Sequence, residues 1–75
     1  MKNLKIEANN ILGTDEMRLV ATEGTKELSV NIDSYTYNQI ALQLIKCNNI
    51  ETFKNLILDN GGSIHIETTI DISRI

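Results

Sequence analysis

Residues 63–75 have the sequence SIHIETTIDISRI, in which apolar and polar side chains alternate. The isoleucines of its first ten positions share one parity: Ile64, Ile66, Ile70 and Ile72. The opposite parity holds polar side chains: His65, Glu67, Thr69, Asp71 and Ser73. Because successive side chains of a strand point to opposite faces, the pattern predicts a long β-strand whose isoleucines face the rest of the domain.

Two stretches upstream, residues 16–22 and 25–32, also alternate and are separated by Glu23-Gly24. Glycine adopts positive φ without a steric penalty, so these two residues are expected to form a tight hairpin turn. The expected cross-strand pairs on the apolar face are Leu19 with Leu28 and Met17 with Val30. Residues 2–8 alternate in the same way and predict a strand before the hairpin.

Between this hairpin and the last strand, the apolar spacing changes to that of α-helices. Asp33-Ser34 offers an N-cap, with Ser34 as the expected capping residue, for a helix over residues 35–47. Asn48 is the expected cap of a second helix over residues 50–60, which Asn60-Gly61-Gly62 ends.

The element order β-β-β-α-α-β predicts an α+β fold in a single domain over residues 1–75. We expect two layers: a four-stranded antiparallel sheet covered on one face by a helical hairpin. The last strand can join the sheet beside the first or the third strand. We favour the first, which gives the strand order 3-2-1-4.

Composition bounds the function. The net charge is −3, the seven lysines and arginines are scattered, and no apolar run is long enough for a membrane span. We therefore expect a cytoplasmic protein that binds neither nucleic acid nor membrane.

A chain of 75 residues buries a limited share of its surface, and Cys47 is its single cysteine, so an internal disulfide is excluded. Homo-oligomerisation, with a dimer as the first expectation, or partner binding is the remaining source of stability.

No catalytic, cofactor or metal signature is present, and we expect the protein not to be an enzyme. His65 and Glu67 lie two residues apart on one strand face, but two ligands do not make a metal site. Cys47 lies at the expected end of a helix, where the partial negative charge raises a thiol pKa, and we expect a buried apolar role for it. Gly61-Gly62-Ser63 runs from helix into strand, which is the reverse of a phosphate-binding loop.

Two surfaces are candidates for partner binding. On the first helix, Tyr35 and Leu42 widen the apolar arc beyond what one sheet face needs. The solvated face of the sheet is the second candidate, with Arg18, Glu27, His65 and Glu67 as its expected contact residues.

These features favour a small non-enzymatic binding protein that acts through protein–protein contacts. Twelve isoleucines, nine asparagines and no proline indicate an AT-rich genome. A small acidic protein of this kind resembles the accessory proteins of phages and mobile elements, some of which inhibit host defence enzymes such as CRISPR effectors. The alternative is an oligomeric binder that sequesters a metabolite or nucleotide signal between subunits, which requires polar groups that converge at an interface.

Overall fold

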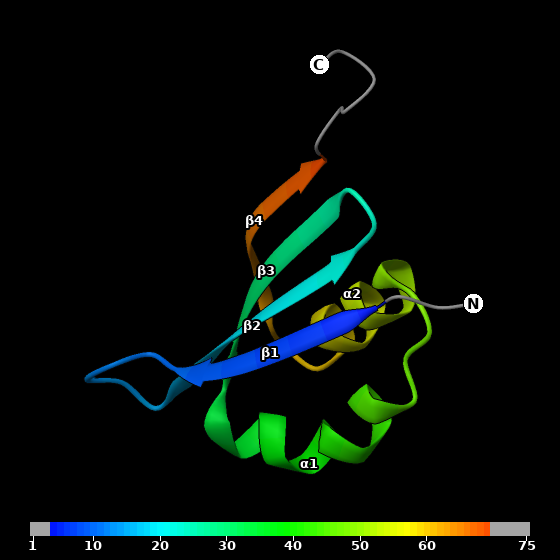
Figure 1. Ribbon diagram of the computed structural model, residues 1–75. Coiled ribbons are helices and arrows are strands. Elements are labelled where there is room, and N and C mark those ends of the chain that lie inside the picture. The colour runs from blue at the N-terminus through cyan, green and yellow to red at the C-terminus, as the bar shows by residue number, and fades with distance from the viewer. Residues whose placement is uncertain (1–3, 70–75) are drawn as a thin grey trace.

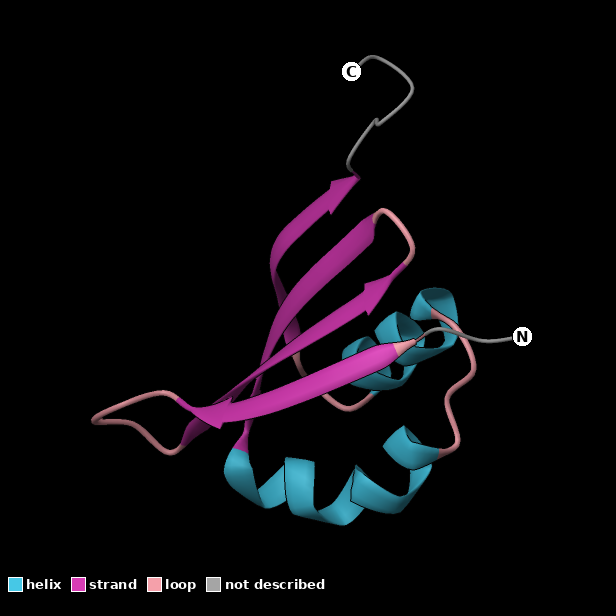
Figure 2. Ribbon diagram, in the orientation of Figure 1, coloured by secondary structure: helices cyan, strands magenta, loops and turns pink. Residues whose placement is uncertain are grey.

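The computed structural model describes residues 4–69. Its elements are, in chain order, β1 (Lys5–Asn10), β2 (Glu16–Glu23), β3 (Lys26–Asp33), α1 (Ser34–Ile45), α2 (Ile50–Asp59) and β4 (Ser63–Thr69). The four strands form one antiparallel sheet, and both helices lie on the same side of it (Figures 1 and 2). The predicted α+β class, element order and two-layer arrangement are confirmed.

The strand order is β1-β2-β3-β4, so β4 pairs with β3 and the favoured order 3-2-1-4 is wrong. The short connection between α2 and β4 explains this position. Gly61 has a φ of +86°, and the N–H of Gly62 donates a hydrogen bond of 2.9 Å to the carbonyl oxygen of Ile57. Gly62 then lies against the carbonyl oxygen of Asn31 in β3, which places the start of β4 beside that strand.

The hairpin turn is one residue further along the chain than expected. It consists of Gly24-Thr25, and Gly24 has a φ of +62°. No other φ near the turn is positive, as in a type II′ turn, which takes glycine at its first central position. The expected Glu23-Gly24 turn would have put glycine second. The observed pairs are Glu23 with Lys26, Ala21 with Leu28, Leu19 with Val30, and Met17 with Ile32. The predicted pairing of Leu19 with Leu28 is therefore wrong, although the same side chains face the core.

A β-bulge at His65 interrupts the alternation of β4. Val30 pairs with Ile64 and the preceding residue, Ser29, pairs with Ile66, so His65 is the extra residue. Directly opposed residues share a face, so Ile64 points to the helices and Ile66 to the outer face of the sheet. Their side chains are 38% and 50% exposed. The prediction that these isoleucines face the helices therefore holds for Ile64 and is wrong for Ile66, and Ile70 and Ile72 lie outside the described residues.

Both helices begin at side-chain caps. Asp33, not Ser34, caps α1: its Oδ1 accepts a hydrogen bond of 3.2 Å from the N–H of Thr36. Asn49, not Asn48, caps α2, and its Oδ1 accepts a bond of 2.8 Å from the N–H of Thr52. Each cap lies one residue from its expected position. In both helices the cap is the residue whose backbone is still extended and whose side-chain oxygen reaches the third helical N–H.

The core lies between the helices and the two central strands. Its largest fully buried side chains are Phe53, Leu19, Leu28, Ile57 and Val30. α1 packs on β2 and β3, and α2 packs on β2, β3 and β4. β1 lies at the sheet edge, so its helix-facing residues Ile6 and Ala8 are only partly buried. The helix layer therefore leaves an apolar margin along β1.

Candidate functional site

α1 presents an apolar side that no described residue covers. The side chains of Tyr35, Leu42 and Ile45 are 71%, 75% and 79% exposed. Tyr35 and Leu42 are seven residues apart, close to two helical turns, and therefore lie on the same side of the helix. The core-facing residues Ile40 and Leu44 lie on the opposite side. We call the group Tyr35, Leu42 and Ile45 the outer face of α1.

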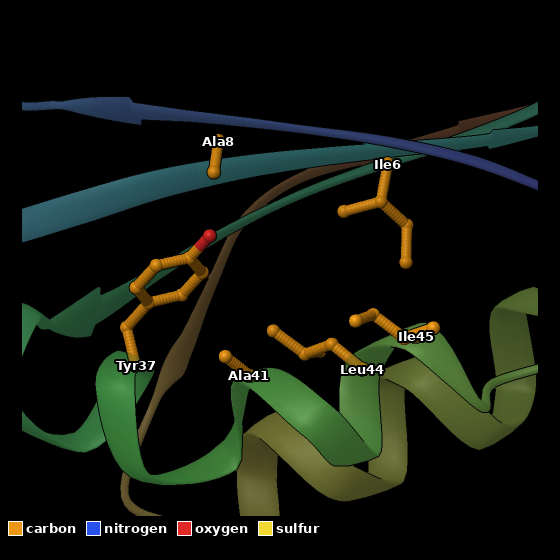
Figure 3. A pocket seen from close by; sticks show the side chains of 6 residues that line it. All are labelled: Ile6, Ala8, Tyr37, Ala41, Leu44 and Ile45. Atoms are coloured by element: carbon orange, nitrogen blue, oxygen red, sulfur yellow. The ribbon is translucent and has the colours of Figure 1, made fainter.

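An apolar groove of about 310 Å³ lies between β1 and α1 (Figure 3). Its lining residues are Ile6, Ala8, Tyr37, Ala41, Leu44 and Ile45. Ile6 and Ala8 project from β1 toward the helix, and the ring of Tyr37 extends from α1 toward Ala8. The hydroxyl of Tyr37 is the single polar side-chain group in this lining. Because Ile45 belongs to both, the groove is continuous with the outer face of α1.

The side of the sheet away from the helices is mostly polar, carries both signs of charge and includes the exposed apolar residue Ile66. Arg18 lies opposite Asn31, and its Nε donates a hydrogen bond of 2.6 Å to the Asn31 Oδ1. Glu27 is exposed on the same face. These two residues lie where the alternation of the hairpin predicts them, and their neighbouring side chains mix polar and apolar character.

His65 and Glu67 do not share a face as expected. The bulge turns Glu67 toward the helix layer, opposite Leu28, where its Oε2 forms an ion pair of 3.1 Å with the Nζ of Lys54 in α2. His65 is the exposed extra residue of the bulge. The six predicted contact residues therefore lie on separate surfaces: Tyr35 and Leu42 on α1, Arg18 and Glu27 on the outer sheet face, and His65 and Glu67 along the β4 edge.

Sequence reasoning missed the groove. The expected strand order 3-2-1-4 puts residues 2–8 inside the sheet, where their apolar side chains would be covered, whereas β1 lies at the sheet edge. An available signal was the brevity of the α2–β4 connection, which favours pairing of β4 with a strand close to the end of α2.

The described residues contain no obvious reactive centre. Cys47 is partly buried against the core, and this burial raises the pKa of its thiol. Its Sγ donates a weak hydrogen bond of 3.5 Å to the carbonyl oxygen of Gln43. Within residues 4–69, no three histidine, cysteine, aspartate or glutamate side chains gather as a metal site would require. Over the same residues, neither helix is long and apolar enough to cross a membrane.

Comparisons with models of known protein families, with curated proteins and with solved structures find no match for this chain.

Proposed function

We propose that the protein is a non-enzymatic binding protein that acts by occupying the surface of a partner protein through the outer face of α1. The observation that carries this proposal is the exposure of three large apolar side chains, Tyr35, Leu42 and Ile45, on one helix. Contiguous exposed apolar patches on small proteins mark interaction sites, whereas scattered single residues do not. Tyrosine is also among the residues that contribute most to the energy of protein interfaces.

The surroundings of the outer face fit a protein partner. Asn38 lies between Tyr35 and Leu42 on the helix surface and is exposed, so it offers an amide for hydrogen bonds at the centre of an apolar contact. Gln39 and Gln43 flank the patch with further uncharged polar groups. An apolar centre with a polar rim is the usual composition of a protein–protein interface.

Self-association is part of the same proposal, with a dimer as the expected assembly. A chain of this size buries a smaller share of its surface on folding than a larger domain does, and the groove beside β1 leaves apolar side chains partly exposed. A second copy that covers the groove adds burial that the single chain lacks.

Within this class of binding proteins, the small size, the acidity and the composition favour a protein that a phage or mobile element encodes and that inhibits a defence enzyme of the host. The alternative function, sequestration of a metabolite or nucleotide, requires converging polar groups. The groove supplies one hydroxyl, from Tyr37, so it favours an apolar contact over a charged ligand.

The experiment compares Leu42→Lys with Gln43→Lys in affinity capture from the source organism, followed by mass measurement of the intact complex. Both positions are exposed on α1, and both variants gain the same charge. We expect Leu42→Lys to keep its melting temperature and lose the captured partner, while Gln43→Lys retains it. Equal capture by the two variants would exclude the outer face of α1 as the binding surface. A large loss of stability in Leu42→Lys would instead assign Leu42 to the core.

A further inference from the structure

We propose that two copies of the chain pair antiparallel through the open edge of β1, in a register centred on Ile6. The result is an eight-stranded sheet with a two-fold axis between the copies and all four helices on one face. This inference rests on the self-association included in the proposed function and specifies where it occurs.

The two edges of the sheet differ in their capacity to pair. β4 carries the bulge at His65 and turns the charged Glu67 toward the helix side, and both features discourage pairing with another strand. β1 pairs with β2 without interruption, and its helix-facing residues Ile6 and Ala8 are apolar, as is Leu4 just before the strand. Among the described strands, β1 therefore has the edge that can accept a further strand.

The hydrogen-bonding phase of β1 fits this register. The N–H of Ile11 donates a bond of 2.9 Å to the carbonyl oxygen of Glu16, which continues the β1–β2 ladder. In an antiparallel pair, the backbone groups of alternate residues point to alternate sides. Ile6 and Ala8 therefore direct their N–H and C=O groups away from β2, toward the open edge. Ile6 can exchange two hydrogen bonds with Ile6 of a second copy, and Leu4 can do so with Ala8.

Charge selects the register among its neighbours. Centred on Ile6, the pairing places Lys5 opposite Glu7 of the second copy, and the two-fold axis repeats this pair. A register centred on Lys5 or on Glu7 places like charges directly opposite each other, which is destabilising. A register centred on Ala8 puts Ile6 opposite the polar Asn10. Pairing centred on Ile6 thus places opposite charges against each other on one face of β1 and apolar side chains against each other on the other face.

The groove supplies the apolar part of the interface. A two-fold axis perpendicular to the sheet keeps both copies of α1 on the same face, one on each side of the β1–β1 pair. The groove residues Ile6 and Ala8 and the exposed Ile45 then face the second copy. Backbone pairing of two strands alone buries little surface area, whereas stable interfaces bury about 800 Å² per partner. The apolar contact is therefore needed for a stable dimer.

Charge reversal tests the register. Sedimentation equilibrium and native mass spectrometry of the full chain should show a dimer. Glu7→Lys and Lys5→Glu each place like charges opposite each other and should raise the dissociation constant by about tenfold or more. An equimolar mixture of the two single variants restores both opposite-charge pairs, so it should form a heterodimer. The double variant Lys5→Glu/Glu7→Lys should form a homodimer again.

Hydrogen exchange gives a second measurement that needs no variant. The amides of Ile6 and Ala8 should become more protected as protein concentration rises, whereas those on the β4 edge should not. A monomer at all concentrations would overturn self-association itself. A dimer that neither charge reversal weakens, or unprotected amides at Ile6 and Ala8, would leave self-association standing and exclude the β1 register. Capture of a different protein through Leu42 is measured separately and decides the partner-binding part of the proposed function.

Discussion

The Oε1 atom of Glu23, at the end of β2, accepts a hydrogen bond of 2.9 Å from the backbone N–H of Ile50, the first residue of α2. The two residues are 27 positions apart in the chain. The carboxylate satisfies an N–H that has no partner within the helix, and its charge faces the positive end of the helix dipole. The hairpin turn and the start of α2 are thereby held together.

Replacement of Glu23 by alanine should lower the free energy of unfolding by about 1 to 2 kcal/mol, because the N–H of Ile50 loses its acceptor. Glu23→Gln keeps an acceptor but removes the charge, so its loss should be smaller. Glu27→Ala, on the exposed outer face of the sheet, is the control and should change stability by less than about 0.5 kcal/mol. Urea denaturation measures all three, and equal losses for Glu23→Ala and Glu27→Ala would contradict the cap.

Gly62→Ala should destabilise the fold by about 1 to 3 kcal/mol, in the range of overpacked sites. A Cβ at this position would collide with the Cγ2 of Ile57 and lie 2.9 Å from the carbonyl oxygen of Asn31. The neighbouring Ser63→Ala is the control, since Ser63 is exposed. Thermal unfolding of both variants checks this prediction, and a Gly62→Ala protein as stable as its control would show that the α2–β4 connection can relax.

Ile66→Ala should cost less than about 1.5 kcal/mol, because half of the Ile66 side chain is already in solvent on the outer face. The alternating pattern of the last strand placed Ile66 in the core, where the same substitution would cost about 2 to 4 kcal/mol. Ile57→Ala is the comparison: Ile57 is fully buried and should lose about 2 to 5 kcal/mol. A loss for Ile66→Ala as large as that for Ile57→Ala, measured from the denaturation midpoints, would show that Ile66 lies in the core.

The thiol of Cys47 should react slowly with iodoacetamide, because burial raises its pKa in the folded protein. The raised pKa means that folding favours the protonated thiol. The stability contributed in this way is fully present below the ordinary thiol pKa and is lost as pH rises through the raised folded-state value. Cys47→Ala should therefore flatten the decline of unfolding free energy above roughly pH 8. An alkylation rate equal to that of the urea-unfolded chain would contradict this.

Local signals in the sequence were enough to predict the fold class and the order of the elements. They were not enough to predict how the strands pair. The apolar faces of Leu19 and Leu28 were assigned correctly, yet their register depended on which turn position Gly24 occupies. The bulge at His65 leaves no mark in the alternation of β4, because it arises from how that strand meets β3. The neighbour of β4 was likewise undetermined, since β1 and β3 both present one apolar face.

The candidate surface divides in the same way. The exposure of Tyr35 and Leu42 followed from their angular position on α1, which depends on helical geometry alone. The groove depends on which strand lies at the sheet edge, and this is a property of the whole topology. The sequence alone therefore does not show that Ile6 and Ile45 line one groove, because this depends on the position of β1 at the sheet edge.

The bulge at His65 and the inward charge of Glu67 also set a limit on growth. If β1 edges pair with each other, the outer margins of the joined sheet are both β4, which resists further strands. Addition of subunits then stops at two, and the molecule cannot polymerise edge to edge into a fibre. Deletion of His65 would straighten β4 and remove the first of these two features, while Glu67 would keep its place opposite Leu28. Such a variant should form more higher oligomers or insoluble aggregates than the unaltered chain at the same concentration.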